Sequence, residues 1–156
     1  EDGTLDPATL FENHREVWFE IGFGGAEHML EQARRDPDVG IIGCEPFLEG
    51  IAKALTGIEE GDLGNIRLHQ VDARDVLNWI APGAPVRFAT YLKPYADEAL
   101  WQVLRHGGFK LTAKVADDWR KPPQDHVTTR YETKRLVDCA PVWFDFTTTP
   151  EDPGNT

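Results

Sequence analysis

A glycine-rich segment between an apolar run and a helix-like stretch constrains the fold of this chain most. The segment is EIGFGGAEH at residues 20–28, and the apolar run at 17–19 precedes it. Gly22 and Gly24 let the backbone bend sharply and approach a ligand closely, because neither carries a Cβ. The helix expected after the turn would present unpaired N–H groups at its start. A strand, a glycine turn and a helix in this order are typical of the first unit of a nucleotide-binding fold.

The pattern of an apolar run followed by a helix-like stretch recurs along the first half of the chain. Residues 39–45 form a near-continuous apolar run, which is typical of a strand buried on both faces. Three such repeats indicate parallel strands joined by right-handed crossovers. The expected strands and helices are, in order, 16–23, 26–35, 39–45, 47–55, 65–71 and 74–79.

Two features refine these helices. Phe47, Ile51 and Leu55 are spaced four apart and are expected to share one face of their helix. Asp72 is expected to cap the helix that follows the third strand.

The second half of the chain begins after a breaker cluster at 81–85 and predicts further strands and helices. A chain of 156 residues is expected to form a single domain over 1–156 that buries about 70% of its unfolded surface. The fold class predicted is therefore α/β, with a central, mostly parallel sheet and helices on both faces. The expected elements are strands at 86–90, 109–115 and 142–146, helices at 95–104 and 129–137, a polar loop at 117–127 and a loose tail at 149–156.

Composition narrows the possible functions. The formal net charge of −11 opposes generic binding to a phosphate backbone, so a nucleic-acid role needs a local basic patch. No run of 18 apolar residues predicts a membrane span, and no signal peptide opens the chain. A cytoplasmic monomer or homodimer is expected. The five histidines and two cysteines show no metal-ligand spacing, so no metal site is expected.

Acidic residues stand at the ends of the first three expected strands. In open parallel sheets, ligands bind beyond the carboxyl ends of the strands. Glu45 follows Gly24 by 21 residues, near the spacing at which an acid meets the ribose hydroxyls of a nucleotide. Asp72 could meet an adenine edge, and Glu20 could organise the glycine turn or hold the amino-acid end of a ligand. The predicted cofactor-binding residues are Glu20, Gly22, Gly24, Glu45, Asp72 and Ala73.

Two cofactors compete for such a site. Dinucleotides prefer a third small residue in the glycine motif, and this chain has Glu27 there, which would repel a pyrophosphate. S-adenosylmethionine has no phosphate and carries a sulfonium cation, so an acidic pocket suits it better than it suits NAD. The alternative is that these acids are solvated loop residues or helix caps.

Several short motifs are spread over nearly the whole chain. They lie at residues 20–28, 42–47, 65–68, 72–74, 87–90, 95–96, 118–120 and 129–134. Together they resemble the bacterial tRNA (guanine-N7)-methyltransferases. The resemblance implies a Rossmann-like class I methyltransferase that transfers a methyl group from S-adenosylmethionine to N7 of a variable-loop guanosine in tRNA. It places Glu20, Glu45 and Asp72 on the cofactor.

The same resemblance assigns a binding role to residues in the last third of the chain. Thr129, Arg130, Tyr131 and Glu132 would lie beside the guanosine or the methionine end of the cofactor. An alternative reading of this segment is a capping box, in which Thr129 starts a helix and Glu132 supports it three residues later. Both readings can hold together.

The chain also departs from the family pattern. A strand–helix unit of roughly 30 residues or more, with a Pro-Asp-Pro-Trp-type motif, is missing near 83–87. It would carry the family's key acid and most of its basic tRNA-facing residues. Tyr91 stands where the family has an Asp that should help bind the guanine. Because the candidate catalytic acid lies in the missing unit, no catalytic residue is assigned, and Glu132 is the nearest substitute.

Three explanations of the gap are open: residues omitted from the sequence, an engineered or truncated protein, or a natural relative that has lost activity. The alternative function is therefore an S-adenosylmethionine-binding protein without catalytic activity.

Overall fold

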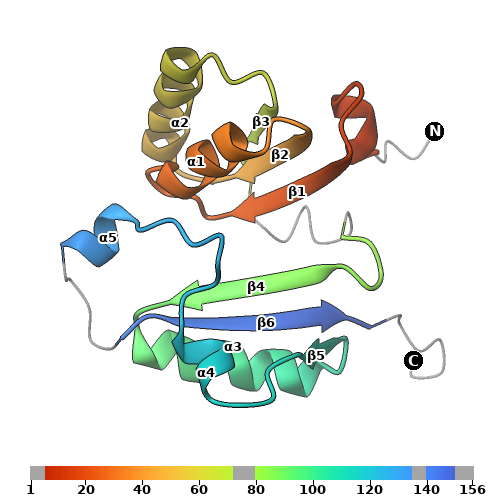
Figure 1. The fold of residues 1–156 in the computed structure, drawn as a ribbon, viewed down its shortest axis with the longest axis vertical. Helices are drawn as coiled ribbons and strands as arrows, with labels where there is room; N and C mark the ends of the chain where they lie inside the picture. The colour runs from red at the N-terminus through yellow and green to blue at the C-terminus, as the bar shows by residue number, and fades with distance from the viewer. Residues whose placement is uncertain (1–5, 72–79, 135–139, 150–156) are drawn as a thin grey trace. The chain divides into compact units, whose positions relative to one another are not determined.

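The computed structural model describes residues 6–71, 80–134 and 140–149. The chain divides into two compact units (Figure 1), an N-terminal unit at Glu1–Trp79 and a C-terminal unit at Ile80–Thr156. The N-terminal unit contains η1 (Pro7–Leu10), β1 (Glu16–Ile21), α1 (Glu27–Arg35), β2 (Val39–Cys44), α2 (Leu48–Gly61) and β3 (Ile66–His69). The C-terminal unit contains β4 (Pro85–Thr90), α3 (Lys93–His106), β5 (Phe109–Leu111), α4 (Asp117–Arg120), α5 (Arg130–Thr133) and β6 (Val142–Thr148).

The sheet of the N-terminal unit is parallel and has the strand order β1-β2-β3. All six residues of β2 are buried, as the continuous apolar run predicts for a central strand. Ile21 pairs with Cys44, and Cys44 pairs with His69. The carboxyl ends of all three strands therefore lie at one edge of the sheet, which confirms the expected parallel arrangement.

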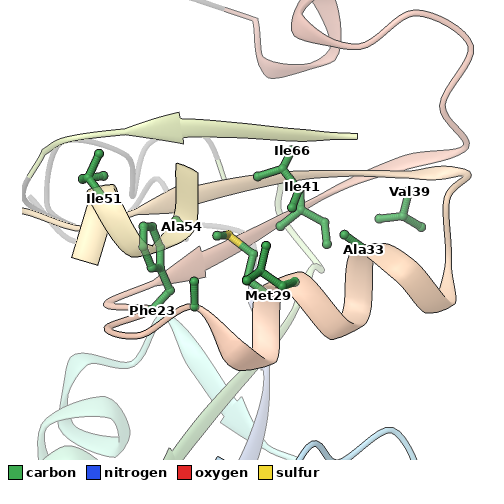
Figure 2. Packing of buried hydrophobic residues seen from close by; sticks show 10 residues of the cluster. Phe23, Met29, Ala33, Val39, Ile41, Ile51, Ala54 and Ile66 are labelled. Atoms are coloured by element: carbon green, nitrogen blue, oxygen red, sulfur yellow. The ribbon is translucent and has the colours of Figure 1, made fainter. Parts of the chain in front are cut away.

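The two described α-helices of this unit, α1 and α2, pack on the same face of the sheet. Met29 of α1 and Ile41 of β2 are fully buried where the helices meet the sheet, and Ala54 of α2 belongs to the same cluster (Figure 2). Close packing of these side chains is the main stabilising contribution in this unit. Phe11, just after η1, covers Ile42 and Cys44 on the opposite face. Burial raises the pKa of the Cys44 thiol.

The C-terminal unit has the strand order β4-β6-β5, with β6 antiparallel to both neighbours. Alternate residues of β6, Phe144 and Phe146, form a core with Ala96 of α3. Trp119 of α4 packs against Phe144, with 6.0 Å between the ring centroids. The α/β class is confirmed, and the six described strands form two three-stranded sheets. Among the described residues, β1 pairs only with β2 and β4 only with β6.

Some boundaries differ from the sequence-based expectations. Helix α2 continues six residues past Leu55, to Gly61, and the left-handed Asp62 ends it. Of its expected face, Ile51 is buried, but Phe47 and Leu55 are exposed because the helix turns Ala54 and Ile58 toward the core.

In the C-terminal unit, β5 is shorter than expected and ends at Leu111. Helix α4 forms inside the expected polar loop, where the Asp118 carboxylate accepts hydrogen bonds from the N–H groups of Lys114 and Val115. These two bonds lower the pKa of Asp118.

Several expectations fall outside the described residues: the helix at 74–79, the end of the helix at 129–137 and the tail beyond 149. Within the described ranges, no helix is both long enough and apolar enough to cross a membrane.

Gly40→Ala tests the packing of the Phe11 ring on β2. A Cβ at Gly40 would lie 2.5 Å from Cγ of the Phe11 ring, and this ring is itself buried. The ring must move, so we expect the free energy of unfolding to fall by about 1–3 kcal/mol. Gly64→Ala is the matched control, because a Cβ there meets nothing within 4 Å, and its effect should stay within about 0.5 kcal/mol. Urea unfolding followed by circular dichroism measures both; equal effects would contradict the packing argument.

Candidate cofactor site

The glycine turn after β1 has the backbone conformation that its sequence predicts. Gly22 and Gly24 have φ angles of 69° and 53°, in the left-handed region that favours glycine. A Cβ at either position would meet nothing within 4 Å. Backbone conformation, and not crowding by neighbours within the unit, is therefore what requires glycine here. The N–H of Gly22 donates to the carbonyl of Cys44 at 2.8 Å and fixes the start of the turn to β2.

Glu45 holds this turn in place from the end of β2. Its side chain is only 5% exposed, and both carboxylate oxygens accept backbone hydrogen bonds. Oε2 accepts from the N–H of Gly24 at 3.1 Å, and Oε1 accepts from the N–H of Phe47 at 3.0 Å. A Cβ at Gly50 would lie 2.8 Å from both Glu45 Cγ and the Gly24 carbonyl, so a glycine lets α2 approach this closely. The structure thus gives the role of organising the glycine turn to Glu45.

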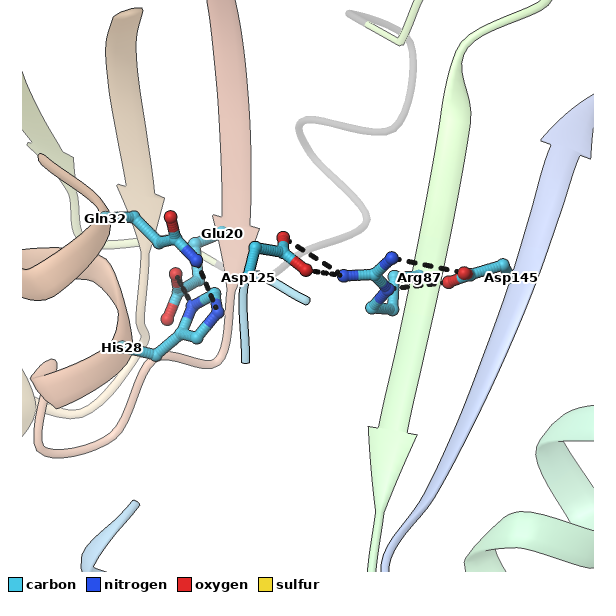
Figure 3. A network of polar contacts seen from close by, with 6 residues as sticks. All are labelled: Glu20, His28, Gln32, Arg87, Asp125 and Asp145. Atoms are coloured by element: carbon cyan, nitrogen blue, oxygen red, sulfur yellow. Dashed lines mark hydrogen bonds and ion pairs between the residues drawn. The ribbon is translucent and has the colours of Figure 1, made fainter. Parts of the chain in front are cut away.

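Glu20 makes different contacts at the end of β1. Its Oε2 lies 2.7 Å from Nδ1 of His28, the second residue of α1. Nε2 of His28 lies 3.4 Å from Nε2 of Gln32, one helical turn further along (Figure 3). Glu20 is partly exposed and contacts no N–H group of the glycine turn among the described residues. Of the two roles considered for Glu20, holding the end of a ligand is the one that these contacts leave open.

The first two of the three predicted carboxylates are therefore carried by neighbouring strand ends. Glu20 pairs in register with Gly43. Glu45 follows β2 directly, and its backbone N–H donates to the carbonyl of His69. Asp72 and Ala73 lie outside the described residues, so their predicted roles stay predictions. The described side chains at this edge offer acceptors, which suit a ligand that brings hydroxyl and ammonium donors.

Apolar surface at the same edge was not assigned a role from the sequence. Phe47 is 73% exposed, Leu48 is 69% exposed, and Ile21 at the end of β1 is also exposed. Of these residues, Phe47 was expected on the shared face of its helix, because apolar periodicity is read first as core packing. Exposed apolar side chains that lie close together indicate a surface that binds another molecule.

In the C-terminal unit, the predicted substrate segment forms the single turn of α5. Glu132 Oε2 lies 3.0 Å from Nε2 of His126, and both side chains are about one-fifth exposed. The Thr129 hydroxyl lies 3.5 Å from Glu132 Oε1 and makes no capping bond to the backbone. The capping-box alternative is therefore not formed. Arg130 is exposed, and the side chain of Tyr131 lies outside the described residues.

His126 and Arg87 anchor the segment before α5, and the sequence pattern indicated a role for neither. The His126 ring meets Trp143 edge-on at 5.2 Å. Arg87 on β4 binds both oxygens of Asp145 at 2.6 and 3.1 Å, and its third nitrogen binds Asp125 at 2.9 Å (Figure 3). The two carboxylates raise the pKa of Arg87. Only folding brings these residues together, because Arg87 and Asp145 are 58 positions apart.

Charge is distributed unevenly between the two units. The N-terminal unit has 6 Lys and Arg against 17 Asp and Glu, whereas the C-terminal unit has 10 of each. Residues 105–135 hold 8 basic and 4 acidic residues. Among the described residues, Arg130 and Lys134 have no ion pair. The basic residues of the C-terminal unit are therefore concentrated in this stretch of the sequence.

Known proteins resemble this chain over most of its length. A family model described as a putative methyltransferase matches residues 14–84. A tRNA (guanine-N(7)-)-methyltransferase of Hyphomonas neptunium is 50% identical over 184 residues, covering 93% of this chain and 84% of that protein. A protein of the same name from Caulobacter vibrioides is 39% identical, covering 93% of this chain and 81% of that protein. Both alignments are 28 positions longer than the 156 residues of this chain.

Solved structures extend the likeness to the fold. The 16S rRNA methyltransferase KamB has a TM-score of 0.67 at 13% identity, and the match covers 92% of each chain. A putative methyltransferase of Streptococcus mutans, in complex with SAH, has a TM-score of 0.56 at 7% identity and covers 87% of this chain and 90% of its own. At such low identity, these matches establish a shared fold.

Glu45→Gln tests the support of the glycine turn. The glutamine amide keeps one acceptor oxygen and turns an NH₂ group toward one of the two backbone N–H groups, which loses its partner. An unsatisfied buried N–H group costs about 1–3 kcal/mol, and we expect the free energy of unfolding to fall by that amount. Glu60→Gln, at an exposed position of α2, is the control and should change little. If chemical denaturation shows no difference between the two variants, Glu45 does not support the turn.

Proposed function

Because this chain belongs to the family of tRNA (guanine-N7)-methyltransferases, we propose that it binds S-adenosylmethionine at the glycine turn and methylates N7 of a guanosine in tRNA. The observation that carries this proposal is 50% identity to a curated member across 93% of the chain. The arrangement of Glu20, the glycine turn and Glu45 at one edge of a parallel sheet supports it.

The acceptors at this edge suit S-adenosylmethionine. The oxygens of Glu45 each accept one backbone hydrogen bond and retain lone pairs for the two ribose hydroxyls. Oε1 of Glu20 has no hydrogen-bond partner among the described residues and can accept from the ligand's ammonium group. The excess of acids in the N-terminal unit favours a ligand that carries a sulfonium and an ammonium charge.

Methylation at N7 requires little acid–base catalysis by the protein. When bound, S-adenosylmethionine supplies an electrophilic methyl group, and guanine N7 already carries a lone pair. The protein's contribution is then to align the two reactants and to exclude water. Glu132, held by His126, is proposed to accept hydrogen bonds from the guanine edge and to favour the cationic product.

tRNA is proposed to contact the basic segment at 105–135 of the C-terminal unit. Arg130 and Lys134 carry charge that no described carboxylate neutralises, so they can meet phosphates. Substrate tRNA is consistent with the predicted cytoplasmic location, and the monomer or homodimer expected from the sequence stays a prediction.

A cofactor-binding protein without activity is the second candidate. The relatives' alignments contain at least 28 positions that have no counterpart in this chain. In addition, β1 and β4 each have one neighbour in their sheets as described. Both observations suit the predicted loss of a strand–helix unit near 83–87, which would carry much of the substrate site.

Binding and methyl transfer together test the two candidates. Calorimetry with S-adenosylhomocysteine reports on the cofactor site. Radiolabelled S-adenosylmethionine with unmodified tRNA transcripts reports on methyl transfer, and chemical cleavage at 7-methylguanosine maps the position. Label at N7 supports the enzyme, and binding without transfer supports the inactive relative. No binding at all would contradict both.

Glu20→Gln tests the cofactor-binding role of Glu20. Losing the negative charge should weaken binding of S-adenosylhomocysteine by about tenfold or more, because charged hydrogen bonds contribute about 1.5–3 kcal/mol. Glu60→Gln again serves as the control and should bind as the unaltered protein does. Isothermal titration calorimetry measures both, and an unchanged affinity in Glu20→Gln would remove Glu20 from the site.

The salt dependence of tRNA binding tests the basic segment. Replacing Arg130 or Lys134 with Gln should lower the slope of log K against log salt by about one for each phosphate that the variant no longer neutralises. Lys53→Gln is the control, because Lys53 of α2 is paired with Glu49 at 2.6 Å. Fluorescence anisotropy over a salt series gives the slopes. If the Lys53 variant lowers the slope as much as the others, the tRNA does not bind where proposed.

A further inference from the structure

We propose that His28 is a positioning residue, which orients the Glu20 carboxylate toward the α-ammonium group of S-adenosylmethionine. This inference rests on the proposed function and deepens it by assigning the recognition of the ligand's amino-acid end. His28 lies next to Glu27, and neither its sequence context nor its spacing to other residues marked it for such a role.

The geometry places His28 across the glycine turn from the strand that carries Glu20. Glu20 is the penultimate residue of β1, and His28 is the second residue of α1. The bond of 2.7 Å between Glu20 Oε2 and His28 Nδ1 therefore spans the base of the turn (Figure 3). The side chains are 21% and 41% exposed, so a ligand can reach the pair.

The hydrogen bonds define which nitrogen of His28 carries the proton. Gln32 is buried, with 6% exposure, and its Nε2 amide group can only donate. The Glu20 carboxylate can only accept, so Nδ1 of His28 carries the proton of their bond, and Nε2 of a neutral ring can then accept from Gln32. Glu20 thus requires the tautomer in which His28 donates to the carboxylate, and the Gln32 amide is placed to support it.

A neutral donor has a specific advantage at this position. Lys or Arg beside Glu20 would cancel the charge that attracts an ammonium group, whereas His28 in its neutral form leaves that charge intact. One anchored oxygen restricts rotation of the carboxylate and directs the other, Oε1, which has no partner among the described residues. Orienting an acceptor before the ligand arrives raises affinity, because less side-chain entropy is lost on binding.

The binding experiment compares S-adenosylhomocysteine with 5′-methylthioadenosine, which lacks the amino-acid group. His28→Leu removes the donor, and we expect it to weaken binding of S-adenosylhomocysteine about five- to tenfold while affinity for methylthioadenosine is unchanged. His28→Asn places an amide N–H near the Nδ1 position and should restore binding to within about twofold. Equal weakening of both ligands in His28→Leu, or no rescue by Asn, would overturn the proposal.

A second experiment needs no ligand. Nitrogen-15 NMR of the histidine rings at pH 8 should show His28 as the Nδ1–H tautomer in the unaltered protein. Glu20→Leu removes the acceptor that holds this proton and should shift the ring toward the Nε2–H tautomer. An Nε2–H ring in the unaltered protein would overturn the proposed positioning. Failure of the unaltered protein to bind S-adenosylhomocysteine would instead refute the proposed function, and His28 would then have no ammonium group to position.

Discussion

The two backbone hydrogen bonds accepted by Glu45 are the constraint on which the candidate site depends. They join the end of β2 to the glycine turn at Gly24 and to the start of α2 at Phe47. A buried carboxylate tolerates such a position only when its oxygens are paired, and here both are. The close approach of Gly50 completes this arrangement, because a side chain there would displace Glu45 or the Gly24 carbonyl. The Glu45 carboxylate and the closely packed start of α2 therefore hold the glycine turn in place before any ligand binds.

The two described carboxylates at this edge have different roles. Glu45 is buried and mainly builds the site, with lone pairs that remain for a ligand. Glu20 is more exposed, and one of its oxygens is bonded to His28 while the other faces no described donor. This division explains how an acidic protein uses its acids in two ways, since one carboxylate shapes the backbone and the other can attract a cation.

The C-terminal unit differs in its polar contacts and in its charge. Its polar contacts join segments far apart in the sequence, as Arg87 does with Asp125 and Asp145, and they hold the approach to α5. Glu132 is in turn held by His126. This unit is neutral overall and carries a locally basic stretch, whereas the whole net charge of −11 resides in the N-terminal unit. The separation of charge matches the separate demands of a cationic cofactor and an anionic nucleic acid.

The sequence by itself determined the parallel strands, the glycine turn and the family, because these depend on local patterns: apolar runs, glycine where φ is positive, and motifs of a few residues. Only the tertiary structure decided that Glu45 supports the turn, that His28 and Gln32 bind Glu20, and that α2 buries Ile51 while exposing Phe47. A carboxylate near a strand end looks the same in a sequence whether it binds backbone or ligand. Its role is set by which N–H groups folding brings within about 3 Å, and those come from other elements of the chain.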